Sequence, residues 1–153
     1  MINIPTIRLA LEADVSDIAE LIYSTSVACC FSPVQPCPKW YEESVQPSQI
    51  ATLFKSEQMV WLVAIEEQKL AGVLAVTDKS HVKYFFVHPA FQKLGVGKKL
   101  WESAMDRGAL GNSITVRSSL FAVPVYQRLG FKAIEPPKSF NGMDYQTMVA
   151  SSR

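Results

Sequence analysis

Residues 87–100 read Val-His-Pro-Ala-Phe-Gln-Lys-Leu-Gly-Val-Gly-Lys-Lys-Leu, and this stretch decides the expected fold. The apolar, aromatic run at residues 84–87 is typical of a buried strand, and residues 98–107 have the amphipathic spacing of a helix. Gly95 and Gly97 stand between them, where glycine permits positive φ and lets another group approach the backbone. A strand, a turn and a helix are therefore predicted to meet here.

The start of the predicted helix is suited to binding an anion. Its first N–H groups have no partner within the helix and lie at the positive end of the dipole, where a phosphate binds well. Lys93, Lys98 and Lys99 add positive charge around the same point. We interpret the stretch as a cradle for a pyrophosphate.

Two common phosphate-binding loops do not match this spacing. A P-loop needs glycine at the position of Gln92 and serine or threonine at that of Lys99. The dinucleotide-binding fingerprint needs a third glycine at Leu100 and an acidic residue about twenty positions further on, where Arg117 and Ser118 stand. Each loop fails at two positions.

The pattern Gln-x-x-Gly-x-Gly after a strand ending Val-x-Pro resembles the acyl-CoA-binding motif of the GCN5-related N-acetyltransferase (GNAT) family. Residues 122–131, Ala-Val-Pro-Val-Tyr-Gln-Arg-Leu-Gly-Phe, are similar to that family's Ala-x-x-x-Tyr-x-x-x-Gly-Phe signature. Two motifs in the right order are far more specific than one, since glycines at a lone turn often serve packing. The resemblance runs from Ile4 to Val149. It implies an α/β fold, with a central mixed, mostly antiparallel sheet flanked by helices.

Length and charge fit a single N-acetyltransferase domain over residues 1–153. A chain of 153 residues is long enough for one core. It carries 15 Lys and Arg against 14 Asp and Glu, which gives no overall field for nucleic acid or an anionic membrane. The start lacks the pattern of a signal peptide, and the apolar run at residues 59–65 is too short to span a bilayer.

Cysteine usage favours an intracellular, cytoplasmic protein. Cys29, Cys30 and Cys37 are odd in number and form no CxxC pattern, so we expect free thiols. Cys29 has no obvious local base and is interpreted as a small buried hydrophobe rather than a nucleophile.

Hydrophobic periodicity predicts the remaining elements. Asp14 or Ser16 is expected to cap the first helix. The proline-rich segment at residues 31–47 is predicted to be a loop, either a surface loop or, by the resemblance, a wall of the acceptor pocket. The predicted strands cover residues 4–11, 59–65, 70–76, 81–87, 113–118, 131–134 and 144–149. The first predicted helix buries Ile18, Leu21 and Ile22 on one face, and a short helix is predicted at residues 48–54.

Pairing of the predicted strands is expected to be antiparallel in the hairpin of residues 59–76. By family analogy, the strand ending at Val87 pairs in parallel with residues 113–118, and the helix between them is the crossover. Its apolar stripe is predicted to include Met105. A loop with Pro136, Pro137, Asn141 and Gly142 separates the last two strands.

The resemblance implies that Tyr126 is the acid that protonates the departing thiolate. A tyrosine, with a pKa of about 10, can donate a proton to the sulfur if it lies within hydrogen-bond reach. Pro124 suits the first turn of a short helix in which Val125 and Leu129 are predicted to form a buried pair, with Tyr126 turned off that axis. The alternative is a core tyrosine that packs the helix on the sheet.

His81 is the candidate base. Many family members carry a glutamate six residues before the position of Val87, and here that position is His81. A histidine with a reference pKa of about 6.5 can take a proton directly or through water. The alternative is a solvated residue at a strand start. Glu66 and Glu67 are weaker candidates, and His88 is expected to cap the turn before Pro89.

The cofactor-binding residues also follow from the resemblance. The backbone of Phe85, Phe86 and Val87 is expected to pair with the pantetheine arm, and N–H groups near Val87 are expected to polarise the thioester carbonyl. Ser119 stands where family members often have an asparagine that contacts the cofactor. The pyrophosphate is expected at Gln92, Lys93, Leu94, Gly95, Val96, Gly97 and Lys98. No metal cluster is visible in the sequence.

The predicted function is transfer of an acetyl group from acetyl-CoA to a primary amine, directly in a ternary complex. The alternatives are a non-catalytic acyl-CoA-binding sensor, which would keep the cradle and lose the acid, and an interaction module of the same fold. The expected partner is a small-molecule or peptide amine, with no nucleic acid and no membrane. The oligomeric state, with a homodimer among the alternatives, and the acceptor stay open.

Overall fold

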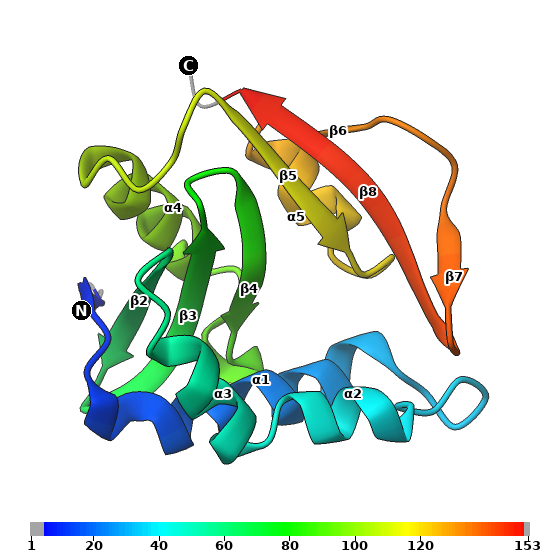
Figure 1. Ribbon diagram of the computed structural model, residues 1–153, viewed down its shortest axis with the longest axis horizontal. Coiled ribbons are helices and arrows are strands. Elements are labelled where there is room, and N and C mark those ends of the chain that lie inside the picture. Colours follow the sequence, from blue (N-terminus) through cyan, green and yellow to red (C-terminus); the bar gives the residue numbers. More distant parts are fainter. Residues whose placement is uncertain (1–4, 152–153) are drawn as a thin grey trace.

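The computed structural model describes residues 5–151 and shows one sheet with helices on both faces (Figure 1). The strand order is β1-β2-β3-β4-β5-β8-β6, with β7 pairing β8 beside this path. All pairs are antiparallel except β4 with β5, which confirms the predicted mixed, mostly antiparallel sheet. The strands are β1 (Thr6–Leu9), β2 (Met59–Glu66), β3 (Lys69–Thr77), β4 (His81–Val87), β5 (Ser113–Ser118), β6 (Lys132–Ala133), β7 (Lys138–Phe140) and β8 (Met143–Ser151).

The helices divide between the two faces of the sheet. One face carries α1 (Val15–Cys30), α2 (Lys39–Ser44) and α3 (Pro47–Phe54), and the other carries α4 (Val96–Asp106) and α5 (Val123–Arg128). Two short 3-10 helices, η1 (Glu12–Asp14) and η2 (Pro89–Phe91), precede α1 and α4. The apolar positions of the central strands alternate between the faces, so each face has its own core.

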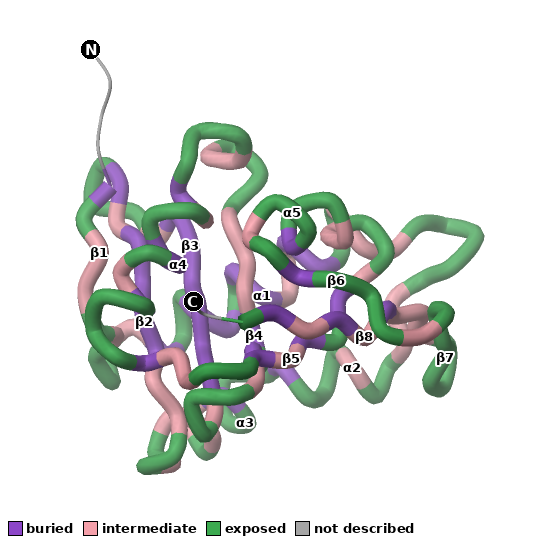
Figure 2. Tube along the Cα trace, turned by 90° about the horizontal axis from the view of Figure 1, so that it is seen from above, coloured by how far each residue is buried: buried purple, intermediate pink, exposed green. Residues whose placement is uncertain are grey.

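The two cores meet at β2 and β3, which are buried on both sides (Figure 2). Leu62 and Leu74 pack toward α4 with Leu100, while Val63 and Val73 pack toward α1 and α3. Since both strands read as continuous apolar runs, the sequence pattern and the two-sided burial agree.

The feature that positions the site is the separation of β4 from β5. These strands pair at His81 with Thr115 and at Val82 with Val116, and then diverge toward α1 (Figure 1). Lys83 has no partner in the register between β3 and β4, so it forms a bulge just where the two strands part. Within the described residues, the register between β4 and β5 contains no pair beyond Val82 and Val116.

The structure corrects several predicted elements. The helix α4 begins at Val96, two residues before the prediction, because Gly95 adopts φ of 84° and directs the chain into the helix at once. Met105 is 40% exposed and does not belong to the buried stripe of that helix. The first strand spans only Thr6–Leu9, and the predicted strand start at residue 4 lies outside the described residues.

Two elements lie where loops were predicted. The proline-rich segment contains α2, which begins directly after Pro38, a residue suited to precede a helix. Lys138–Phe140 is a strand that forms a hairpin with β8, and its turn is made by Asn141 and Gly142, both with positive φ. The predicted strand at residues 131–134 is reduced to Lys132–Ala133.

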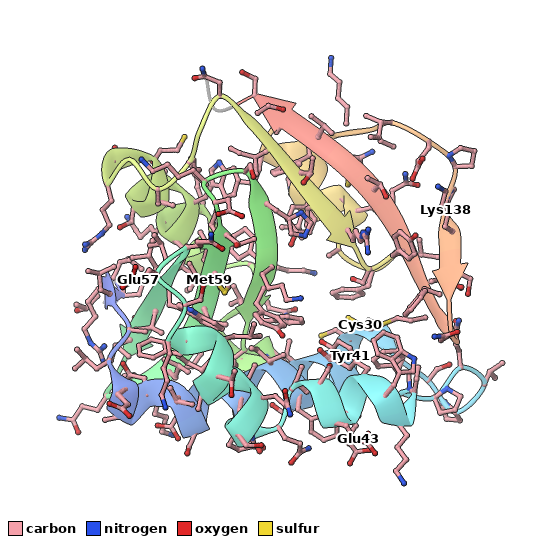
Figure 3. The ribbon with its side chains drawn as sticks, viewed as in Figure 1. Cys30, Tyr41, Glu43, Glu57, Met59 and Lys138 are labelled. Atoms are coloured by element: carbon pink, nitrogen blue, oxygen red, sulfur yellow. The ribbon has the colours of Figure 1, made fainter. Side chains whose placement is uncertain are left out.

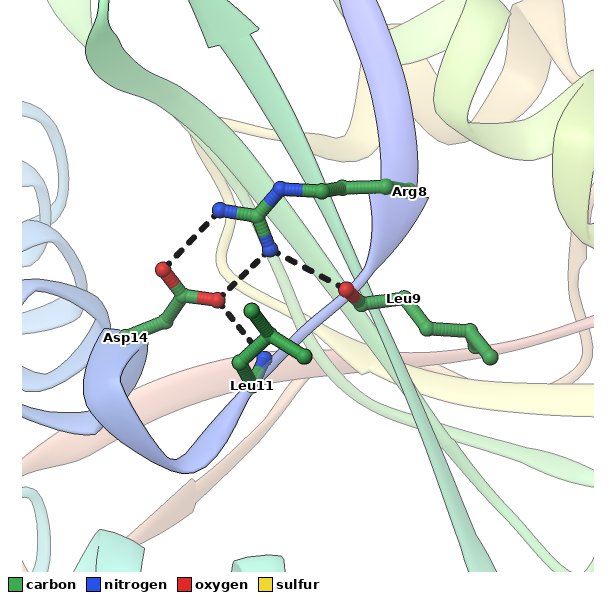
Figure 4. A network of polar contacts seen from close by, with 4 residues as sticks. All are labelled: Arg8, Leu9, Leu11 and Asp14. Atoms are coloured by element: carbon green, nitrogen blue, oxygen red, sulfur yellow. Dashed lines mark hydrogen bonds and ion pairs between the residues drawn. The ribbon is translucent and has the colours of Figure 1, made fainter.

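The predicted cap of α1 is also different. Neither Asp14 nor Ser16 forms a side-chain cap hydrogen bond at α1. The Asp14 carboxylate instead accepts hydrogen bonds from the Leu11 N–H at 2.7 Å and from the Arg8 guanidinium at 2.7 and 3.1 Å (Figure 4). This network joins β1 to η1, and the neighbouring Arg8 lowers the pKa of Asp14.

Within residues 5–151, no helix has the length and hydropathy needed to cross a membrane.

Candidate active site

The loop between β4 and α4 is held by its own hydrogen bonds. The His88 Nδ1 atom accepts from the Ala90 N–H at 3.0 Å, which confirms the predicted cap of the turn. The Gln92 Nε2 atom donates to the Val87 carbonyl at 2.9 Å and ties the loop to the end of β4. The motif glutamine therefore holds the loop by its side chain, and the backbone of Gly95 then enters α4 in the left-handed conformation.

The first turn of α4 presents backbone donors. The first hydrogen bond runs from the Lys99 N–H to the Gly95 carbonyl at 3.1 Å. The preceding N–H groups, at residues 96–98, have no acceptor within the helix and lie at the positive end of its dipole. The Val96 side chain is buried in the core, and the Lys98 side chain is exposed. An anion here would meet backbone donors, with lysines around them.

Gly97 leaves space between α4 and β4. A Cβ atom on this residue would lie 3.6 Å from the Phe85 ring and 3.7 Å from a Val87 methyl, which is ordinary van der Waals contact. Packing within the protein therefore does not require glycine there. A ligand chain lying along Phe85 and Val87 would occupy the same space, which gives the glycine a reason other than packing.

Tyr126 is part of the core on the α4 face. It is 6% exposed, and its ring lies 5.9 Å from that of Phe85 and 5.3 Å from that of Phe131. Val125 is 40% exposed, so the predicted buried pair of Val125 and Leu129 is wrong and Tyr126 is the buried residue of α5. Burial, and secondarily the neighbouring Cys30, raises the pKa of Tyr126, which keeps its hydroxyl protonated at neutral pH.

His81 lies where β4 is still paired with β5, on the face of α1. Its Nδ1 atom is 2.8 Å from the Thr115 hydroxyl, which itself donates to the Ser80 carbonyl at 3.3 Å. A hydroxyl that already donates its proton must accept from Nδ1–H, so this chain leaves Nε2 as the basic atom. Burial first, and then Lys83 and Arg117, lower the pKa of His81 and favour the neutral ring.

The end of α1 contributes a residue that the sequence did not single out. The Cys30 thiol lies beside Ser119 and within electrostatic reach of Tyr126 and Tyr41. Burial raises the pKa of Cys30, which keeps it a neutral thiol. Figure 3 shows Cys30 next to Tyr41. No local pattern could have revealed it, since Ser119 and Cys30 are far apart in the chain.

Cys29 and Ser119 have local contacts of their own. Cys29 is half-buried rather than buried, which corrects the prediction, and its sulfur lies 3.6 Å from the Gln92 Nε2 atom. The Ser119 hydroxyl accepts from the Ala122 N–H at 3.2 Å and fixes the turn into α5. Cys29, Cys30 and Cys37 all carry free thiols.

A pocket of about 390 Å³ opens on the face of α1, α2 and α3. Its wall combines α2 and α3 with β4 and the start of β8, and Trp40, Tyr41, Lys83, Tyr84 and Met143 are among the lining residues. The Trp40 Nε1–H donates to the Asn141 carbonyl at 2.8 Å, which joins α2 to the β7–β8 hairpin. The proline-rich segment thus forms the wall of a pocket.

The structure brings some predicted residues together and separates others. Phe85, Val87, Gly97 and Tyr126 gather on the α4 face, whereas Phe86 packs in the opposite core. Leu94 is 68% exposed, and Lys93 is exposed as well.

His81 lies apart from these residues. Along β4, it is roughly 13 Å from Phe85 at about 3.3 Å per residue, so it does not touch Tyr126. In the part of the chain that the structure describes, no group of three His, Cys, Asp or Glu could hold a metal ion.

Comparison with known proteins shows the family and the fold of this chain. The profile of the acetyltransferase (GNAT) domain matches residues 28–152. A GCN5-related N-acetyltransferase structure from Rhodopseudomonas palustris has a TM-score of 0.79 at 20% identity, over 99% of this chain and 98% of that one. The acetyltransferase yncA from Salmonella typhimurium, solved with acetyl-CoA, has a TM-score of 0.72 at 23% identity, over 99% and 95%.

A further structure, PaiA N-acetyltransferase from Thermoplasma acidophilum in complex with coenzyme A, has a TM-score of 0.70 at 16% identity, over 97% of this chain and 99% of that one. At these identities the solved structures show a shared fold. No curated protein matches the sequence.

Proposed function

The chain belongs to the GCN5-related N-acetyltransferase (GNAT) family, and from this premise we propose that it transfers an acetyl group from acetyl-CoA directly to a primary amine in a ternary complex. The observation that carries the proposal is that the first turn of α4, Gly97 and the buried Tyr126 meet around one stretch of β4. This stretch of β4 lies beyond the point where the pairing of β4 with β5 ends.

The donor side rests on backbone groups. The N–H groups at residues 96–98 would bind the pyrophosphate, as helix starts do, and Lys98 would add charge. Phe85 and Val87 would hold the pantetheine arm along β4, beside Gly97. Structures of the similar proteins yncA and PaiA contain acetyl-CoA and coenzyme A, which supports this assignment.

Tyr126 would act as hydrogen-bond donor to the leaving sulfur. Its raised pKa keeps the proton on the hydroxyl through neutral pH, and its contacts with Phe85 and Phe131 hold the ring. Acetyl-CoA supplies the activated acetyl group as a thioester. The hydroxyl stabilises the sulfur when it gains charge, which favours the transition state over the bound substrate.

His81 would remove the amine proton through water. The hydrogen bond from His81 Nδ1–H to the Thr115 hydroxyl leaves Nε2 as the acceptor. Burial, and then Lys83 and Arg117, lower the pKa of His81 and favour its neutral ring. The same cations disfavour a protonated amine nearby, which raises the share of the reactive neutral form. Because His81 does not contact Tyr126, the base and the acid would act from separate positions along β4.

The test is release of coenzyme A thiol from acetyl-CoA over a panel of primary amines. Tyr126→Phe keeps the ring packing and removes the hydroxyl, so we expect kcat to fall about a hundredfold while acetyl-CoA affinity stays unchanged. Tyr23→Phe, on α1 away from the site, is the matched control and should retain full activity.

Three outcomes are decisive. Undiminished turnover in Tyr126→Phe would remove this residue from the mechanism. Tight binding of acetyl-CoA without turnover on any amine would favour the non-catalytic sensor. Absence of acetyl-CoA binding, measured as no rise of the melting temperature, would favour the interaction module and contradict the proposal. The cytoplasmic location and a homodimeric assembly stay predictions.

A further inference from the structure

The pocket on the α1–α3 face has the lining of a site for a small apolar molecule. Trp40, Tyr41 and Tyr84 give it three aromatic side chains, and Leu53 and Met143 add apolar surface. Its volume of about 390 Å³ lies in the range of small-molecule sites. The aromatic wall is fixed: the Tyr41 hydroxyl is 2.8 Å from the Ser26 hydroxyl, and Trp40 is tied to the β7–β8 hairpin.

The charge around the pocket is positive. Among the described residues that line it, Lys83 is the only charged one, and none carries a carboxylate. The Lys83 ammonium lies 5.8 Å from the centre of the Tyr84 ring, against the aromatic wall. Arg117 projects from β5 on the same face, with its guanidinium 5.6 Å from the Tyr145 ring. Both cations lower the pKa of His81, which places Lys83 and Arg117 near this residue.

Resting on the acetyl transfer proposed above, we infer that the acceptor is an amine that also carries a carboxylate and an apolar body, the chemistry of an aromatic or large apolar amino acid. The carboxylate pairs with Lys83, and the apolar body packs on Trp40, Tyr41 and Tyr84. The amine is then held near the bulge where β4 and β5 part. An amine with several positive charges meets Lys83 and Arg117 and finds no carboxylate in the lining, so polyamines are disfavoured.

The position of Lys83 makes it a suitable probe. It is exposed and stands in the bulge, outside the strand register, so its side chain can be changed without loss of core packing. Lys83→Gln removes the charge at nearly constant length, and Lys83→Arg keeps the charge. Lys69→Gln, an exposed lysine at the β2–β3 turn, is the matched control.

The experiment compares four amines with the wild type and these variants: L-phenylalanine, phenethylamine, L-alanine and spermidine. Turnover is followed by thiol release, and binding by calorimetry at saturating coenzyme A. We expect kcat/KM for L-phenylalanine to exceed that of the other three at least tenfold. In Lys83→Gln the KM for L-phenylalanine rises about tenfold, the KM for phenethylamine rises much less, and the KM for acetyl-CoA stays unchanged. Lys83→Arg and Lys69→Gln behave as the wild type.

The results separate this inference from the proposed function. Turnover of spermidine or phenethylamine at or above the rate of L-phenylalanine overturns the acceptor class and leaves the acetyltransferase intact. Binding of L-phenylalanine that needs Lys83, without turnover of any amine, supports the pocket assignment and contradicts the proposed function. An equal loss on all amines in Lys83→Gln overturns the pairing with a carboxylate.

Discussion

The two faces of the sheet around β4 build their sites in different ways. On the α4 face, the donor site comes from one nearly continuous stretch, residues 85–98, joined by Tyr126. On the α1–α3 face, the pocket is assembled from α2, α3, the bulge of β4 and the start of β8. A site of backbone groups on consecutive residues leaves a pattern in the sequence, and a site of side chains from distant segments does not.

This difference also separates what each site can recognise. The proposed donor site offers backbone N–H groups, which a change of side chain does not remove. The pocket offers aromatic rings and Lys83, which are all side chains that a substitution replaces. Substitutions should therefore affect acetyl-CoA and the acceptor separately, and the following experiments test that separation.

The largest effect is expected from His81→Asn, which keeps a donor near Thr115 and removes the basic Nε2 atom. We expect kcat/KM to fall about a hundredfold with unchanged acetyl-CoA affinity. In the wild type, burial and nearby cations lower the pKa of His81, so activity should fall with decreasing pH along a limb whose midpoint lies below 6.5. The variant should lack this limb.

The pH profile is measured as kcat/KM from pH 5 to 8. His88→Asn is the matched control, since the chain has 2 histidines and His88 serves the turn before α4. A wild-type profile with no acid limb, or the same limb in both His81→Asn and the wild type, would exclude His81 as the base.

A smaller effect on the donor side is expected from Gly97→Ala. The added methyl meets Phe85 and Val87 at ordinary contact distance, and alanine favours a helix over glycine by up to about 1 kcal/mol. The fold should therefore be as stable or more stable, while acetyl-CoA binds about tenfold more weakly because its space is reduced. Calorimetric titration measures the affinity for acetyl-CoA, and thermal unfolding measures the stability of the fold.

The matched control for that variant is Glu102→Ala, which introduces alanine at an exposed position of the same helix. It should leave acetyl-CoA affinity unchanged. Wild-type affinity in Gly97→Ala would show that the space beside β4 is not used by the cofactor.

The smallest effect is expected on the acceptor side from Trp40→Leu. It removes the hydrogen bond to the Asn141 carbonyl and the edge contact with Phe140 at 5.4 Å between ring centres. Since Trp40 is partly exposed, we expect a loss of about 1 kcal/mol in stability and about a threefold rise in the KM of the acceptor. The KM of acetyl-CoA should not change, and steady-state kinetics check both values.

Trp40→Phe keeps a ring and loses the hydrogen bond, so it should show an intermediate effect. If Trp40→Leu weakened acetyl-CoA as much as the acceptor, the two faces would not act as separate sites.

Much of the fold could be predicted because periodicity and glycine placement are local. The strands β2 to β5 lie within two residues of their predicted bounds, and His88 caps its turn as expected. The prediction failed where tertiary contacts decide: α2 and β7 are short, and each is stabilised by the contact of Trp40 with Phe140 and Asn141. The orientation of α5 was wrong because Val125 and Tyr126 are both apolar enough to be buried, and the neighbouring Phe131 selects Tyr126.

The sequence by itself determined the family, the mixed sheet and the strand, turn and helix around Gly95 and Gly97, since these follow from consecutive residues whose spacing is visible. Only the tertiary structure decided that β4 and β5 part after Val82, that Cys30 lies beside Ser119, and that Lys83 lines an aromatic pocket. The physical reason is the separation along the chain between the residues that interact. Backbone conformation and helix starts depend on near neighbours, whereas a pocket depends on which distant side chains the packed cores bring together.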